Sequence, residues 1–174
     1  NSPALVVQSV GGGGGGVAMV TKDVTMGATG SGLATGGNID VFNQSVIETY
    51  GSNSIGLLVQ SVGGGGGFSG MSSGDNVILG GSVEGDSSGG SVNASNEASI
   101  TTLGKNSAGF LAQSIGGGGG ATAKSDGLLS RLGGESSKMA NSGVVIIDNG
   151  ANIATGGKGS PALMAQSIAG GGGY

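Results

Sequence analysis

Acidic side chains are the groups in this sequence best suited to acid–base chemistry, because histidine and cysteine are both absent. The commonest general base and the thiolate nucleophile are therefore missing. A glycosidase-like site needs two carboxyl groups held about 5–10 Å apart. Glu84 and Asp86 are close in the sequence, and Asp23 and Asp40 are weaker candidates. None of these acids recurs at the same place in the chain's internal repeat, so we predict solvated surface residues. We expect no enzyme, no cofactor and no metal site.

Lysine next to glycine does not make a phosphate-binding loop in this chain. Lys105 and Lys158 each follow a glycine, but the motif G-x-x-x-x-G-K-[ST] needs an earlier glycine where the chain has Ser99 and Asn152. The formal net charge of −4 also argues against a nucleic-acid partner. Asn43 fits a glycosylation sequon with Gln44 and Ser45, but its place in the repeat favours a structural turn residue.

The composition excludes several classes of protein. Glycine supplies 44 of the 174 residues, while charged residues make up 9% and hydrophobic residues 36%. Disordered chains are usually rich in charge and poor in apolar residues, so this one does not fit them. Collagen is excluded because there is no G-X-Y period and there are only two prolines. No apolar stretch approaches the ~20 residues of a membrane span, and the start of the chain has no basic region typical of a signal peptide.

A repeat of about 53 residues organises the whole chain. The phrase L-V-V-Q-S-V recurs in similar form three times, and each of the four copies lies close before a glycine run. Its glutamines are spaced by 52, 53 and 53 residues: Gln8, Gln60, Gln113 and Gln166. The same period relates Asn43, Asn96 and Asn149. We predict one repeat array over residues 1–174, cut from a longer one. Its parts are the end of a preceding repeat at 1–16, repeats at 11–62, 63–115 and 116–168, and a further glycine run at 169–174.

Each repeat is predicted to form strands. Residues 38–43 alternate in the pattern of a strand, and turn residues bound the β-branched segments. The segment Leu57–Val62 is apolar on both faces, so we expect it to be covered on both sides. Strands that stack on neighbours at a fixed period make a β-solenoid. The prediction is an all-β parallel β-solenoid (β-helix) of ~53-residue repeats, with two or three coils in each repeat.

The glycine runs are expected to be ordered parts of this fold. Extended polyglycine lies close to a neighbouring backbone because it has no Cβ atoms. We predict a polyglycine II-like form, stacked on one face between repeats and covering Leu58, Gln60 and Val62, with Gly65 and Gly118 as structural positions. The alternative is a flexible loop. Buried amides must be hydrogen-bonded, so we expect the glutamines to bond local backbone or one another. The asparagines are expected to do similar work at a turn, and ligand binding is the alternative for both.

Several residues together resemble a known family. The stretch Ser107-Ala108-Gly109-Phe110-Leu111-Ala112-Gln113-Ser114-Ile115, followed by Gly116–Gly120, is similar to the glycine-rich repeats of bacterial autotransporter passenger regions, as is the pattern of Asn96, Ile100, Thr102 and Gly104. The resemblance covers nearly the whole chain. The sequence departs from the family pattern at residues 77–86 and 128–135. The resemblance implies a type V secreted protein at the surface of a Gram-negative bacterium, anchored through a C-terminal outer-membrane β-barrel that this sequence does not contain.

The expected function follows from the repeat and from this resemblance. The first hypothesis is a non-catalytic stalk segment that holds distal elements away from the cell and supports adhesion or aggregation. The second is a binding module whose repeated surface engages host or sister-cell partners, including other copies of itself. An enzyme built on a β-helix is the third and least favoured. The sequence specifies no ligand.

Overall fold

The computed structural model describes residues 2–20, 24–27, 32–72, 76–80, 85–125, 129–132, 139–170 and 172–173. These residues form strands, turns and bends, and none of them is helical. The strands belong to six sheets, and all the pairs within them are parallel. The prediction of an all-β fold with parallel strands is therefore confirmed.

The phrase with the glutamine forms a central sheet with the order β1-β7-β13-β18. Its strands are β1 (Leu5–Val10), β7 (Leu57–Val62), β13 (Phe110–Ile115) and β18 (Leu163–Ile168). The second sheet contains the ends of the glycine runs, in β2 (Gly14–Val20), β8 (Gly66–Ser72), β14 (Gly119–Ser125) and β19 (Gly172–Gly173). Successive strands of both sheets come from successive repeats of the sequence.

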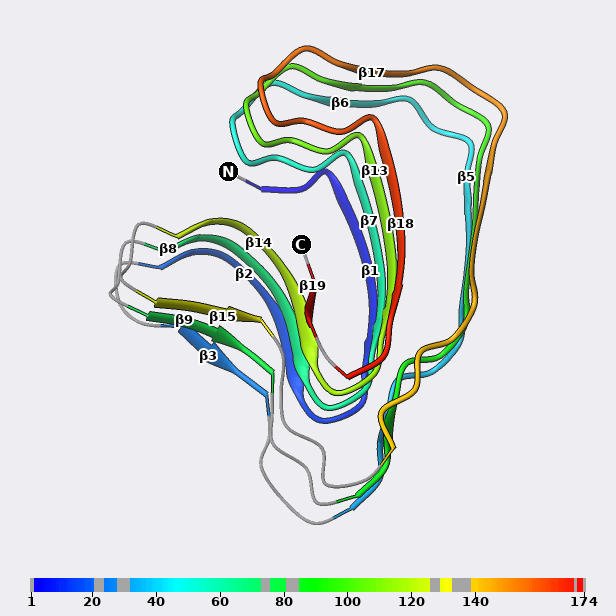
Figure 1. Cartoon of the computed structure of the whole chain (residues 1–174). Coiled ribbons are helices and arrows are strands. Elements are labelled where there is room, and N and C mark those ends of the chain that lie inside the picture. Colours follow the sequence, from blue (N-terminus) through cyan, green and yellow to red (C-terminus); the bar gives the residue numbers. More distant parts are fainter. Residues whose placement is uncertain are drawn as a thin grey trace.

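Four smaller sheets complete the described structure. Two of them form its outer side: β5 (Ile39–Asn43), β11 (Val92–Asn96) and β16 (Val145–Asn149), then β6 (Ile47–Thr49), β12 (Ile100–Thr102) and β17 (Ile153–Thr155). The others are β3 (Val24–Met26), β9 (Asn76–Leu79) and β15 (Leu129–Leu132), and the pair β4 (Ala34–Thr35) and β10 (Ser87–Ser88). The traces of successive repeats nearly coincide when they are viewed along the stack (Figure 1).

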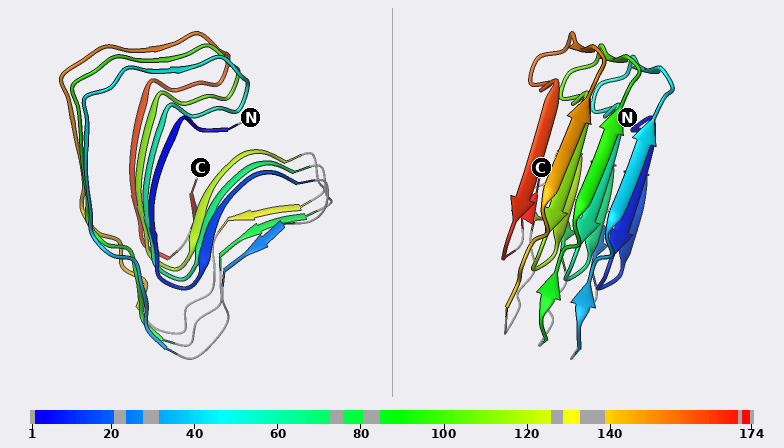
Figure 2. Two further views of the ribbon diagram at one scale, coloured as in Figure 1. Left: turned by 180° about the vertical axis from the view of Figure 1, so that it is seen from behind. Right: turned by 90° about the vertical axis from the view of Figure 1, so that its right-hand side faces the viewer.

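Each strand pairs with its own counterpart one sequence period away. Leu5 pairs with Leu57 across 52 residues, and Phe110 pairs with Leu163 across 53. Within the described residues, no two strands of one repeat share a sheet. The expectation of two or three coils per repeat is therefore wrong, because a repeat of several coils would pair strands at a fraction of the period. One repeat fills one layer, and the side view shows the layers next to one another (Figure 2).

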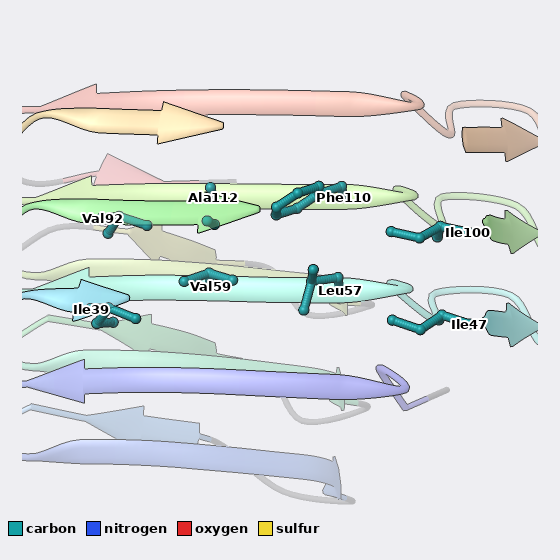
Figure 3. Close-up of a cluster of buried hydrophobic side chains, with 9 residues drawn as sticks. Ile39, Ile47, Leu57, Val59, Val92, Ile100, Phe110 and Ala112 are labelled. Atoms are coloured by element: carbon teal, nitrogen blue, oxygen red, sulfur yellow. The ribbon is translucent and has the colours of Figure 1, made fainter. Parts of the chain in front are cut away.

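The central sheet lies between two others and is covered on both faces, as the apolar pattern predicts. All six residues of β7, and all six of β13, are buried. One face packs on β5, β11, β6 and β12 through a cluster that includes Leu57, Val59, Phe110 and Ile100. Figure 3 shows these side chains in adjacent layers. The other face contributes Leu58 and Leu111 to a second cluster.

The glycine runs at 11–16, 63–67 and 116–120 bend and then enter paired strands, and they do not form polyglycine II. That helix repeats a φ near −75° with three residues per turn, whereas Gly14, Gly66 and Gly119 have φ of +155°, +135° and +145° and begin paired strands. The N–H of Gly66 donates to the carbonyl of Gly13 at 3.0 Å, and that of Gly119 donates to the carbonyl of Gly65 at 3.0 Å. Strand pairing satisfies the glycine backbone and continues directly into the residues that follow.

Gly65 and Gly118 lie where the chain bends between the two large sheets. Their φ values are +90° and +88°, and Gly13, the preceding counterpart, has +84°. Side chains rarely adopt this left-handed conformation. A Cβ atom on Gly118 would also lie 3.0 Å from the carbonyl oxygen of Gly65. Glycine is thus required here both by conformation and by the close approach of the neighbouring layer.

We expect Gly118→Val to destabilise the fold by about 2–4 kcal/mol, through the strained φ and the clash with the layer beneath. Thermal unfolding followed by circular dichroism measures this loss. Gly150→Ala is the matched control, because the nearest atom to a Cβ there is 3.8 Å away; we expect it to change stability by less than about 0.5 kcal/mol. Equal melting temperatures for wild type and Gly118→Val would show that the run is a loop.

Candidate functional site

A ladder of glutamine amides runs through the buried centre of the stack. The Nε2 of Gln8 donates to Oε1 of Gln60 at 2.6 Å, and the Nε2 of Gln60 donates to Oε1 of Gln113 at 2.5 Å. Gln113 donates in the same way to Gln166. Gln60 and Gln113 are fully buried. An amide has both a donor and an acceptor, so identical amides in register satisfy one another at any number of layers.

The glutamine face of the central sheet is covered by the sheet that contains the glycines. A Cβ atom on Gly16 would lie 4.0 Å from Oε1 of Gln8, which places the glycine backbone next to the ladder. Beyond the glycines, Phe68 of β8 joins Leu58 in the second apolar cluster. The face of Leu58, Gln60 and Val62 is therefore fully buried.

An asparagine ladder closes the turn after the outer strands. Asn43 donates through Nδ2 to Oδ1 of Asn96 at 2.7 Å, and Asn96 donates to Asn149 at 2.7 Å. Each Nδ2 also donates to the backbone carbonyl two residues further on, which for Asn43 is that of Ser45 at 2.9 Å. Asn43 is only 6% exposed. Its amide is therefore buried and hydrogen-bonded within the fold, which argues against glycosylation at Asn43.

A third chain of hydrogen bonds links serine hydroxyls to glycine backbone. Ser61 Oγ donates to the carbonyl of Gly37 at 2.9 Å and accepts from the N–H of Gly90 at 2.8 Å. One repeat later, Ser114 Oγ donates to Gly90 at 2.8 Å and accepts from Gly143 at 2.8 Å. Sequence reasoning did not predict this series of hydrogen bonds. Its signal was the serine after every repeated glutamine, together with glycines at the same 53-residue spacing.

The turn before each central strand repeats a fourth set of contacts. The hydroxyl of Thr49 donates to the carbonyl of Ser54 at 2.8 Å, and Thr102 and Thr155 do the same to Ser107 and Ser160. The residues before these serines, Asn53 and Asn106, have φ of +56° and +51°. Asparagine is enriched among the few non-glycine residues in that region, which explains its place in this turn.

The described acidic residues do not gather into a cluster that could hold a metal ion. No group of three or more histidine, cysteine, aspartate or glutamate side chains gathers among the residues the structure describes. The carboxylate of Asp86 accepts from the backbone N–H of Met139 at 3.3 Å. Glu84 and Asp23 lie outside the described residues, as do parts of the stretches 77–86 and 128–135. Lys105 and Lys158 are exposed at the turn after β12 and β17.

One described side chain has a clearly shifted pKa. The hydroxyl of Tyr50 donates to Oε2 of Glu48 at 2.6 Å. This hydrogen bond, the negative charge of Glu48 and a small desolvation effect, in that order, raise the pKa of Tyr50 above 10.0. The raised pKa favours the folded state below pH 10, and this effect disappears as the pH rises through the folded pKa.

The chain matches no family model, no curated protein and no solved structure. Within the described part of the chain, no helix is long and apolar enough to cross a membrane.

We expect Gln60→Leu to destabilise the fold by about 2–4 kcal/mol, because the half-buried Nε2 of Gln8 and the buried Oε1 of Gln113 both lose their partner. Gln166→Leu is the matched control: it removes one bond, at the half-buried end of the ladder, and should cost about 1 kcal/mol. Chemical denaturation measures both. Equal losses for the two variants would mean that the ladder contributes little beyond packing.

We expect Glu48→Thr to lower the pKa of Tyr50 toward 10, because both the acceptor and the neighbouring charge are removed. Threonine occupies the equivalent place at Thr101, so the fold tolerates it. The tyrosinate absorbance reports the titration, with Tyr174→Phe as background because the chain has two tyrosines and no tryptophan. An unchanged Tyr50 pKa would contradict the hydrogen bond.

Proposed function

We propose that this chain is a segment of a parallel β-solenoid in which one ~53-residue repeat forms one coil. The observation that carries the proposal is the pairing of each strand with its counterpart one period away, which holds for all four strands of the central sheet. The amide ladders support it, since each amide bonds the same residue of the next repeat. Such arrays gain stability from contacts between neighbouring repeats.

We further propose a structural role for this segment, as a stalk in the passenger region of a bacterial type V autotransporter. The support for the family is the repeated phrase around Gln113 and its glycine run. On this proposal the segment is secreted, lies at the cell surface and supports adhesion or aggregation without catalysis. Each layer adds the spacing of paired strands, about 4.8 Å. Backbone pairing and the side-chain ladders resist bending of the stack.

The alternative function is a binding module, and a contrast between inward and outward residues favours it. The inward glutamines and asparagines are identical in every repeat, whereas the outward residue of β5 changes from Asp40 to Asn93 and Ile146. Variation of exposed residues beside unchanged buried amides is expected where the outer face contacts partners. Those partners are cell-surface ligands or other copies of the chain, not nucleic acid.

A replacement experiment separates the two functions. The array in the full-length protein is exchanged for an unrelated solenoid with the same number of layers, and adhesion and aggregation of the cells are measured. The stalk proposal expects adhesion to return to the wild-type level. Loss of adhesion despite normal surface display, checked with an antibody to a distal epitope, would favour the binding module.

A further inference from the structure

The first part of the stack has an excess of acidic over basic residues, and the repeat does not require this excess. Between Lys22 and Lys105 the sequence contains no lysine or arginine, yet it contains seven acidic residues: Asp23, Asp40, Glu48, Asp75, Glu84, Asp86 and Glu97. Three of them, Asp40, Glu48 and Glu97, are exposed on or beside the outer strands. These carboxylates make the outer strands of the first two layers negative, and the first lysine after them, Lys105, is exposed at the turn after β12.

Exposed aromatic side chains occur at the same place. Phe42 is 58% exposed and Tyr50 is 70% exposed, whereas Phe68 and Phe110 are buried in the two cores. Val46, at the bend between β5 and β6, is 64% exposed, and Leu103, which follows β12 as Tyr50 follows β6, is 52% exposed. Figure 1 shows β5 and β6 meeting at the outer corner of the stack. We call Asp40, Phe42, Val46, Glu48 and Tyr50 the acidic corner.

The stack itself does not explain these side chains. The counterparts of Phe42 in the next two layers are Ser95 and Asp148, so an aromatic ring is not needed for pairing. Apolar side chains gathered on a surface and bordered by polar ones are typical of interaction sites. Tyrosine and other aromatic residues are enriched at the centres of such sites.

The carboxylates of the acidic corner are positioned by neutral partners. Glu48 accepts from the hydroxyl of Tyr50 at 2.6 Å, and Asp40 accepts from Nδ2 of Asn93 at 3.1 Å. Neither has an ion pair with a described lysine or arginine. A cation from outside can contact a carboxylate and the face of an aromatic ring together, which combines a charge-assisted hydrogen bond with a cation–π interaction.

We infer that the acidic corner binds a basic polypeptide segment, with arginine or lysine side chains over Phe42 and Tyr50 and against Asp40 and Glu48. Charge complementarity selects this partner, because anionic ligands are repelled and a second copy presents the same negative corner. The inference rests on the binding alternative of the proposed function. It can fail while the stalk role stands, because its test is carried out on the purified chain without cells.

The test measures binding of a fluorescein-labelled peptide in which arginine alternates with serine, by fluorescence anisotropy at low and high salt. A peptide with glutamate in place of arginine is the probe control. The variants take residues from the neighbouring repeat: Phe42→Ser with Tyr50→Leu removes the rings, and Asp40→Asn with Glu48→Thr removes the charges. Ile146→Asn is the matched control, because Ile146 is an exposed apolar residue, 54% exposed, on the same sheet but outside the corner.

We expect wild type to bind the arginine peptide, and not the glutamate peptide, with weaker binding at high salt. Each double variant should weaken binding about fivefold or more, and Ile146→Asn should leave it unchanged. Absence of binding overturns the proposal. The proposal is also overturned if the variant without the two rings binds the peptide as tightly as wild type, because such binding would depend only on the net charge. Sedimentation velocity that shows a wild-type dimer lost on removing the rings would assign the corner to a second copy instead.

Discussion

Parallel pairing between equivalent residues is the constraint on which the rest of this structure depends. Inside the stack each side chain faces its counterpart in the layers above and below, so an inward position accepts only residues that pack or bond with that counterpart, as Leu57 does with Phe110. Leucine, valine and isoleucine do so by dispersion, and glutamine and asparagine do so because an amide is both donor and acceptor. Charged residues do not, since like charges opposite one another are destabilising. This explains why the described acids lie outside and change from repeat to repeat, as at Asp40, Asn93 and Ile146.

The glycine runs follow from the same constraint. The chain must leave the central sheet, bend and return as a second sheet that covers the glutamine face. Gly13, Gly65 and Gly118 supply the left-handed bend in successive layers. The next glycines begin a strand whose neighbours approach so closely that a Cβ atom on Gly66 would lie 1.7 Å from the carbonyl oxygen of Gly119. Residues without side chains are needed because two layers and two sheets converge there.

Much of this arrangement could be predicted from the sequence, because repeated residues at fixed spacing reveal which positions meet. The all-β class and the two-sided cover of Leu57–Val62 follow from the spacing and the apolar pattern. The number of coils per repeat does not, since a period fixes the offset between partners but not the number of turns within it. The backbone conformation of the glycines could not be predicted either, because a run without side chains has no pattern that distinguishes a strand from polyglycine II. The bonds between Ser61, Gly37 and Gly90 join two segments about 25 residues apart, which periodicity alone does not bring together.

The pairing of strands at one full sequence period also bears on what such a stack is suited to do. A layer of 53 residues adds about 4.8 Å of length, whereas the same residues in one α-helix would extend about 80 Å. Length alone therefore does not account for so large a coil. A wide coil provides stiffness, because several sheets and side-chain ladders connect each pair of layers, and it provides a broad lateral surface. Inner positions are limited to apolar side chains and amides that bond one another, whereas outer positions change type between repeats; on the binding proposal, Phe42, Glu48 and Tyr50 are the outer residues that contact a partner.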